Sequence, residues 1–247
     1  MHNLICILLI ITLLTSSKCT IPDYINVCPA SHPDISDCII NSIKSLTPRL
    51  KAGIPELDIP SLEPLQIDGI SFHTGSETAN IATNITNITI WGASNFNIVK
   101  LSVKPNENGK TFEFEVTIPQ LFAQGHYEMN TKILFLDLRG KGPFNANVSD
   151  YHFSCILKGL VQNINGANHL QFEPLKCKVS TGQKKFHLEN LLDANPIITQ
   201  ATNGIIDDNT EALFREIRPG LKKSVETKII SMANKITLAF EYEELFP

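Results

Sequence analysis

Apolar and polar residues alternate without a break in the segment TFEFEVTIP, residues 111–119. Phe112, Phe114, Val116 and Ile118 would share one face of an extended strand, and glutamates and threonines would occupy the other face. This alternation is typical of an antiparallel sheet that has one buried face and one solvated face.

Comparable strand signals run from about residue 70 to residue 188. The strand that follows TFEFEVTIP has one face made of Tyr127, Met129, Thr131, Ile133 and Phe135. Asn108-Gly109 is typical of a hairpin turn, and Arg139-Gly140-Lys141-Gly142 is expected to turn the chain into the strand FNANVSDYHFSCILKG. Several strands joined by short turns predict an antiparallel meander.

A helical pattern precedes the sheet region. After a cap at Asp34 or Ser36, an apolar stripe predicts a helix that Gly53 ends. The stripe consists of Ile39, Ile40, Ile43, Leu46 and Leu50, and Pro48 should kink the last turn. The next segment contains Pro55, Pro60 and Pro64, so it is expected to exclude a helix and to run extended along a sheet edge.

A second helical pattern follows from Pro196 onward. Its apolar stripe covers about 27 residues, roughly 40 Å at the helical rise, and Pro219 should bend it without ending it. The stripe consists of Phe214, Ile217, Leu221, Val225, Ile229, Met232, Ile236 and Phe240. Only the apolar face of the sheet is long enough to cover it. The sequence therefore predicts an α+β fold in which a strongly curved antiparallel sheet wraps around a long C-terminal helix.

The chain begins with an apolar run, Ile5 to Leu14, that is too short to span a bilayer. Small residues at Ser17 and Cys19 suit signal peptidase, so residues 1–19 are expected to be a signal peptide and residues 20–247 a single domain. The alternative is a buried N-terminal helix. No other apolar stretch approaches the length of a membrane span, and we expect a secreted, extracellular protein without stable membrane insertion.

Cysteine usage agrees with export, because cleavage after Cys19 would leave four cysteines, an even number. Cys28 and Cys38 are close enough in sequence to tie the N-terminal segment to the first helix. Cys155 and Cys177 each lie eleven residues from Gly166, so a hairpin that turns at Gly166 would place them opposite each other. We therefore predict the disulfides Cys28–Cys38 and Cys155–Cys177, with two buried free thiols as the alternative for the second pair.

Composition and charge fit an ordinary globular chain. The 247 residues are 43% hydrophobic and 19% charged. The chain has 21 basic and 25 acidic residues. The resulting formal charge of −4 argues against nucleic-acid binding. Asn84, Asn87 and Asn147 each begin an Asn-X-Ser/Thr triplet and are candidate glycosylation sites.

The sequence offers no catalytic signature. GxSxG, HExxH, GxGxxG and P-loop patterns are absent, and the seven histidines form no i, i+4 pair. Gly140-Lys141-Gly142 weakly resembles a phosphate loop, but a hairpin turn that needs positive φ is the favoured interpretation. The acidic segment at residues 207–211 lacks the spacing of a calcium loop and is interpreted as helix capping. We therefore expect no enzyme, no metal and no cofactor.

Four segments carry a resemblance to a known family: Cys28 with Cys38, the run Gly53-Ile-Pro-Glu-Leu-Asp-Ile-Pro-Ser-Leu-Glu-Pro-Leu65, the stretch Trp91-Gly-Ala-Ser-Asn-Phe96, and the terminus Tyr242-Glu-Glu-Leu-Phe-Pro247. On these the chain resembles the insect juvenile-hormone-binding and takeout-like family of the tubular lipid-binding superfamily. The resemblance implies an elongated apolar tunnel and a secreted, non-catalytic carrier of a juvenile-hormone-like terpenoid, a fatty acid or a related lipid. It also implies a role in hormone, chemosensory, feeding or circadian signalling.

The expected ligand-binding residues come from the apolar faces of the strands and of the long helix. They are Phe112, Phe114, Val116, Ile118, Tyr127, Met129, Ile133, Phe135, Phe153, Leu157, Ile217 and Leu221. Tyr127 is the expected polar handle, because its hydroxyl can donate from an otherwise apolar face. The expected partner is a small hydrophobic ligand bound to a monomer. The alternative is a secreted signalling protein that acts through an unidentified receptor, with ligand binding secondary.

Overall fold

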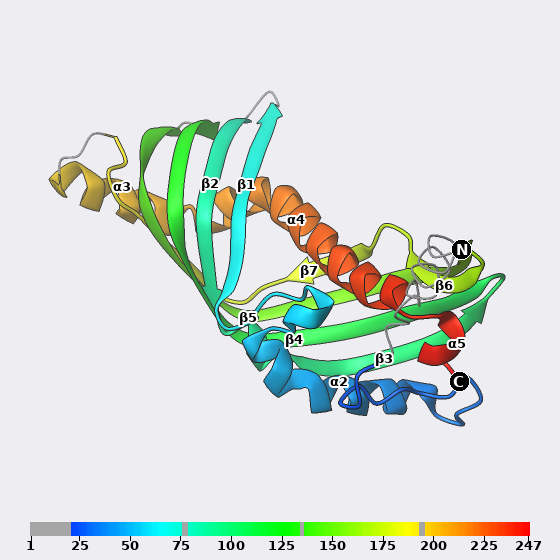
Figure 1. Cartoon of the computed structure of the whole chain (residues 1–247). Coiled ribbons are helices and arrows are strands. Elements are labelled where there is room, and N and C mark those ends of the chain that lie inside the picture. Colours follow the sequence, from blue (N-terminus) through cyan, green and yellow to red (C-terminus); the bar gives the residue numbers. More distant parts are fainter. Residues whose placement is uncertain (1–20, 76–78, 134–135, 193–195) are drawn as a thin grey trace, which may run out of the picture.

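The computed structural model describes residues 21–75, 79–133, 136–192 and 196–247. Within these ranges eight strands form one strongly curved antiparallel sheet, and the helices α2 Ile35–Ala52 and α4 Thr210–Ala239 lie on its inner side (Figure 1). The sheet is a half-barrel that cradles the long C-terminal helix, as the sequence predicts. The expected signal peptide lies outside the described residues.

Two very long strands carry the sheet. The strands are β1 Leu65–Gly75, β2 Ala79–Trp91, β3 Asn97–Asn106, β4 Gly109–Ile133, β5 Leu136–Ile164, β6 Ala167–Phe172, β7 Lys176–Ser180 and β8 Lys184–Leu188. β4 pairs with β5 along its whole length, and its other edge pairs with β3 and then with β2. The outer edge of β5 pairs in turn with β8, β7 and β6. The sheet is therefore not the simple meander expected, since β4 and β5 are long enough to pair with several strands placed end to end.

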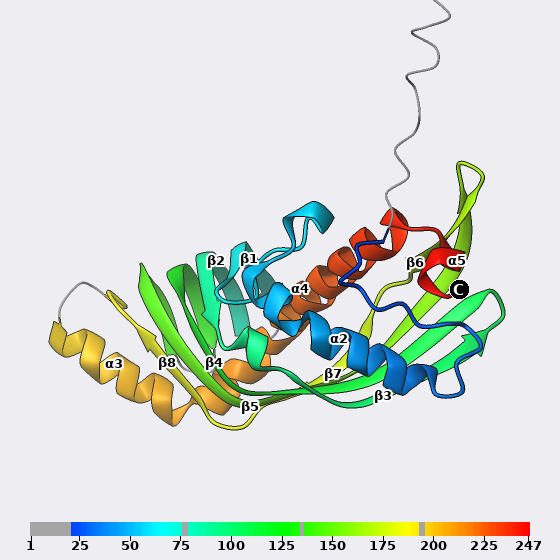
Figure 2. The same cartoon turned by 60° about the horizontal axis from the view of Figure 1, so that its bottom comes forward.

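The helices are α2 Ile35–Ala52, α3 Pro196–Asp208, α4 Thr210–Ala239 and the short α5 Tyr242–Leu245, with 3-10 turns η1 Pro55–Leu57 and η2 Ala93–Asn95. Asp34 caps α2 by accepting a hydrogen bond from the Asp37 N–H over 3.0 Å. Gly53 follows α2 with a φ of 91°, a conformation that favours glycine. Figure 2 shows α2 and α4 facing each other above the curved floor of the sheet.

The C-terminal helical region is divided at Asn209. The Asn209 side chain donates to the Ile205 carbonyl over 2.8 Å, which satisfies the end of α3. Thr210 likewise donates to the Ile206 carbonyl over 3.0 Å. The acidic segment thus lies at a helix boundary, as expected, although Asn209 bonds back to α3 and its side chain makes no capping bond to α4. Pro219 lies inside α4 without ending it.

The turn expected at Arg139–Gly142 is wrong. β4 ends at Ile133 and β5 already begins at Leu136, so Gly140 and Gly142 lie inside β5. A Cβ atom on Gly140 would lie 2.8 Å from the Asn190 carbonyl oxygen, and one on Gly142 would lie 2.6 Å from the Glu189 carbonyl oxygen. Here glycine is needed for the close approach of a neighbouring backbone and not for positive φ.

The proline-rich segment also differs from the expectation of an extended strip along the sheet edge. Pro55 begins the 3-10 turn η1, and Ile54 pairs with Ile59 across it. Ile54, Leu57 and Ile59 are buried in a cluster with Phe240 at the end of α4. The prolines exclude an α-helix, but they are compatible with a tight turn, and three apolar residues gain burial from that turn.

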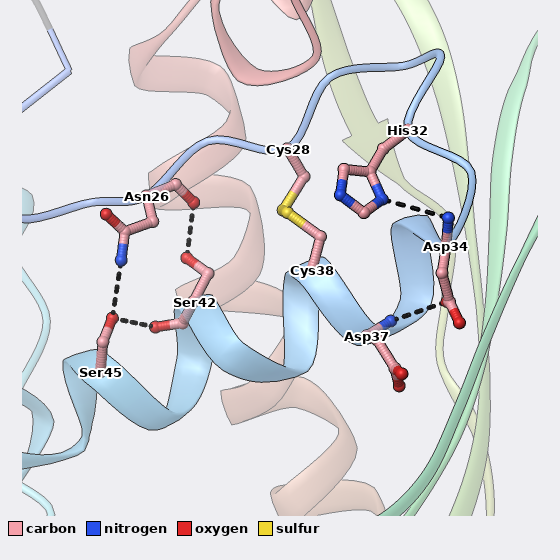
Figure 3. The surroundings of a disulfide bond; sticks show 8 residues. All are labelled: Asn26, Cys28, His32, Asp34, Asp37, Cys38, Ser42 and Ser45. Carbon is pink, nitrogen blue, oxygen red and sulfur yellow. Dashed lines mark hydrogen bonds between the residues drawn. A yellow bond between two sulfur atoms is a disulfide. The ribbon is translucent and has the colours of Figure 1, made fainter.

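Both predicted cysteine pairs form disulfides. Cys28 is joined to Cys38 in α2, and the adjoining segment is held by a hydrogen bond of 2.7 Å from the Ser42 hydroxyl to the Asn26 carbonyl (Figure 3). Cys155 faces Cys177 across the β5–β7 pair. The β5–β6 register, extended without a break, would place Lys176 opposite Cys155. One extra residue between β6 and β7 brings Cys177 into position instead.

Candidate functional site

A cavity of about 700 Å³ lies between the concave face of the sheet, α2 and α4. β4 contributes Phe112, Phe114, Val116, Ile118, Leu121, Ala123, Tyr127 and Met129 to its wall. The opposite wall comes from α4, with apolar residues from Phe214 to Met232, and α2 adds Ile39, Ile43 and Leu50. The lining is almost entirely apolar.

The inward-facing residues change parity once along β4. They have even numbers up to Ile118 and odd numbers from Leu121 onward. The paired strand β5 changes at the same level, from Tyr151 to Val148, beside Asp150 with its positive φ of 49°. Successive side chains in a strand point to opposite faces, so a break in alternation is required at this level for both halves of the sheet to turn an apolar face to one hollow.

The structure brings most of the predicted ligand-binding residues to this cavity. Phe112, Phe114, Val116, Ile118, Tyr127, Met129, Phe153, Leu157 and Leu221 all line it. Phe135 lies outside the described residues, and the side chains of Ile133 and Ile217 lie outside the described part as well.

Sequence reasoning missed a large part of the wall, above all the residues from β1 and β2. Ile67 and Ile70 in β1 line the cavity, as do Ile85, Ile88 and Ile90 in β2. The isoleucines of β2 do not alternate regularly, because the pairing register shifts between Thr86 and Thr89. Such a bulge adds one residue and hides the two-residue period, which is the signal that could have revealed this wall.

Two tyrosines reach the cavity with different surroundings. Tyr127 is buried, and its hydroxyl donates to the Glu189 carbonyl over 2.6 Å. Burial, together with the charge of Glu189, raises the pKa of Tyr127 to about 12. Burial also raises the pKa of Tyr151 to about 12, and no described residue hydrogen-bonds its hydroxyl. The Tyr127 hydroxyl proton is therefore used in a bond within the protein, whereas the Tyr151 hydroxyl has no partner among the described residues.

Charged groups reach the cavity only from α4 among the described residues. Arg218, Lys222 and Lys228 line it, and the Lys222 ammonium lies 3.7 Å from the Glu226 carboxylate. Further along α4, Lys235 forms an ion pair with Asp58 beside η1. That hydrogen bond and the positive charge of Lys235 lower the pKa of Asp58. The ion pair and the cluster around Phe240 fix the end of α4 against the N-terminal segments.

No group of three or more His, Cys, Asp or Glu side chains suited to a metal ion occurs in the described ranges. None of the helices among the described residues is both long and apolar enough to cross a membrane. The three candidate glycosylation sites, Asn84, Asn87 and Asn147, are exposed to solvent.

The chain matches known proteins over nearly its full length. A sequence model described as "Haemolymph juvenile hormone binding protein (JHBP)" matches residues 5–247. "Circadian clock-controlled protein daywake" of Drosophila melanogaster is 21% identical over 216 residues, which cover 85% of this chain and 83% of that protein. Its counterpart in Drosophila yakuba is 20% identical over the same length.

The fold has a counterpart among solved structures. The crystal structure of Epiphyas postvittana Takeout 1 superposes with a TM-score of 0.75 at 16% identity, covering 90% of this chain and 99% of that one. The curled sheet and its helices are thus shared with a takeout protein. Together with the match over residues 5–247, this shows that the chain belongs to the haemolymph juvenile hormone binding protein family, with takeout-like members.

Proposed function

We propose that this protein is a secreted, monomeric and non-catalytic carrier that holds one small hydrophobic ligand in the cavity between the sheet and α4. The single observation that carries this proposal is the hollow of about 700 Å³ with its apolar wall. Its volume lies within the range of sites that enclose small molecules. The nine predicted residues that line it are the proposed ligand contacts.

The length of the cavity wall favours a long ligand. From Phe214 to Met232 the wall follows α4 for about 27 Å at the helical rise. An extended chain advances about 1.2 Å per bond, so this length suits about 20 bonds. A single-chain lipid or an extended terpenoid fits this length.

Burial supplies the driving force for binding. Removing roughly 300 Å² of apolar ligand surface from water contributes about 7 kcal/mol before the entropy costs of association. The free hydroxyl of Tyr151 is the proposed polar handle, in place of Tyr127. It would give orientation to a ligand that carries a hydrogen-bond acceptor.

The extracellular setting is supported by the two disulfides and by the apolar run at the N-terminus. Relatives described as circadian clock-controlled motivate the further proposal that the ligand serves hormone, chemosensory, feeding or circadian signalling. A transcript level that stays constant through a light–dark cycle would count against the circadian part.

The carrier proposal is tested by extracting secreted protein and identifying co-purified lipid by native mass spectrometry, followed by titration of the lipid-free protein with terpenoids and fatty acids. Ala123 faces the cavity, so the larger side chain in Ala123→Phe should occupy part of it and weaken binding. The neighbouring Gln124 is exposed and does not line the cavity, so Gln124→Phe is the matched control. Absence of bound lipid and of uptake, or equal binding by both variants, would refute the proposal.

A further inference from the structure

Two cationic side chains, Arg218 and Lys184, lie near the Phe214 ring at the start of α4, and one of them is hydrogen-bonded to Thr181. The Arg218 guanidinium lies 5.7 Å from the centre of the Phe214 ring, and Arg218 also lines the cavity. The Lys184 ammonium lies 5.0 Å from the same ring. It donates to the hydroxyl oxygen of Thr181, another lining residue, over 3.2 Å. The connection between β7 and β8 and the first turns of α4 therefore bring polar groups to a mostly apolar wall.

Lys184 is a buried support and not a direct ligand contact. Its side chain is only 3% exposed, and its ammonium also donates to the Gly182 carbonyl over 2.9 Å and to the Glu211 carboxylate over 2.6 Å. All three ammonium protons are thereby used, and Glu211 balances the charge. Because the Thr181 oxygen accepts from Lys184, the hydroxyl proton of Thr181 is left to donate toward the cavity.

Arg218 differs from Lys184 because no carboxylate among the described residues pairs with it, and its guanidinium lies near the Phe214 ring instead. Arg218 is exposed to solvent as well as lining the cavity, so it stands at the rim. A guanidinium at this position offers several donors to a planar anion while the anion keeps part of its hydration.

We propose that Arg218 and Thr181, with Lys184 behind Thr181, bind the carboxylate of an amphipathic ligand whose apolar chain lies in the cavity. This inference rests on the proposed carrier function and names the chemical class of its ligand. Both contact groups are donors, and a carboxylate is an acceptor with a charge that matches Arg218. The corresponding methyl ester has the same chain but lacks the charge, and its alkoxy oxygen is a weak hydrogen-bond acceptor. The rim position avoids the cost of burying an unpaired charge.

The test compares hexadecanoic acid with its methyl ester in displacing an apolar fluorescent dye from lipid-free protein. The acid should bind about tenfold more tightly than the ester, as expected for one charge-assisted hydrogen bond. Arg218→Met keeps an unbranched apolar side chain but removes the guanidinium, and it should weaken binding of the acid about tenfold while leaving binding of the ester unchanged. Lys223 is exposed on the same helix and does not line the cavity, so Lys223→Met should keep the preference.

A second pair of variants tests the contribution of the hydroxyl. Thr181→Val should reduce the preference for the acid, and Thr181→Ser should retain it. The inference is overturned if the unchanged protein binds the acid and the ester equally well. It is also overturned if Arg218→Met still prefers the acid. Either result leaves the carrier function in place. If neither compound displaces the dye, the carrier proposal fails, and the inference fails with it.

Discussion

The carboxylate of Glu63 joins the proline-rich segment to the turn that follows β2. It accepts hydrogen bonds from the Gly92 N–H at 3.0 and 3.1 Å and from the Ser94 hydroxyl at 3.0 Å. Ser94 is buried, and Gly92 has a φ of 89° with no space for a Cβ atom beside the Gln120 carbonyl. Glu63→Ala would leave two donors unpaired in a turn with little freedom to rearrange.

The expected loss follows from these contacts. A hydrogen bond to a charged acceptor contributes about 1.5–3 kcal/mol, so with some rehydration Glu63→Ala should lower the free energy of unfolding by about 3 kcal/mol. For a chain of this size that corresponds to a fall in melting temperature of roughly 6–12 °C. Glu63→Gln keeps a carbonyl acceptor but not the charge, and about half of this loss is expected.

Urea denaturation and thermal melting of the purified variants would measure these changes. Glu173 has an exposed side chain, and Glu173→Ala is a control expected to stay within about 0.5 kcal/mol of the unchanged protein. The reasoning is refuted if Glu63→Ala is as stable as this control. It is also refuted if Glu63→Gln is as damaging as Glu63→Ala, since the amide still offers an acceptor.

Three further predictions concern other parts of the fold. The pKa of Asp58 is lowered by its hydrogen bond to Lys235, so this pair stabilises the fold above the unfolded pKa of about 3.8 and loses its effect as the pH falls through the folded pKa. Asp58→Asn should therefore lower the melting temperature at pH 7, and this difference should shrink as the pH falls through the folded pKa of Asp58. Gly140→Ala should destabilise the protein by about 1–3 kcal/mol, because the added Cβ would clash with the Asn190 carbonyl. Gly204 lies in a helix with open space around it, so Gly204→Ala should stabilise the protein by up to about 1 kcal/mol in the same urea assay. Replacing both cysteines of the Cys155–Cys177 disulfide, 22 residues apart, by serine should cost about 3 kcal/mol, and unchanged stability relative to the native oxidised protein would contradict the assignment.

The sequence predicts the faces of the elements better than their connections. Phe112 and Phe114 alternate with glutamates, and this local pattern is enough to identify the buried face. The residues of β4 that face the cavity change from even to odd numbers between Ile118 and Leu121, but on each side of this break the alternation of inward-facing and outward-facing residues is regular. The sequence therefore predicts both faces correctly without showing that one continuous strand connects them.

The errors have a common physical cause, which is contact with a distant segment. Gly140 and Gly142 have the composition of a turn, and only the approach of residues 189–191 explains why they lie inside a strand. Ile54 and Ile59 close a tight turn because Phe240, nearly 200 residues later, completes their cluster. The Glu63 carboxylate likewise meets a turn about 30 residues away. The secondary-structure propensities of neighbouring residues contain no information about such distant contacts.

Whether the roll is hollow also depends on packing that the alternation pattern does not encode. Phe112, Phe114 and Phe153 point inward but are only half-buried, whereas a filled core would bury them completely. An apolar face is equally satisfied by a second layer of side chains or by a ligand, because both remove it from water. The protein's own side chains therefore do not fully remove the apolar surface of the cavity from water, and a bound ligand would complete its burial. A ligand that fills it at one hundred times its dissociation constant would add about 2.7 kcal/mol to the stability of the protein.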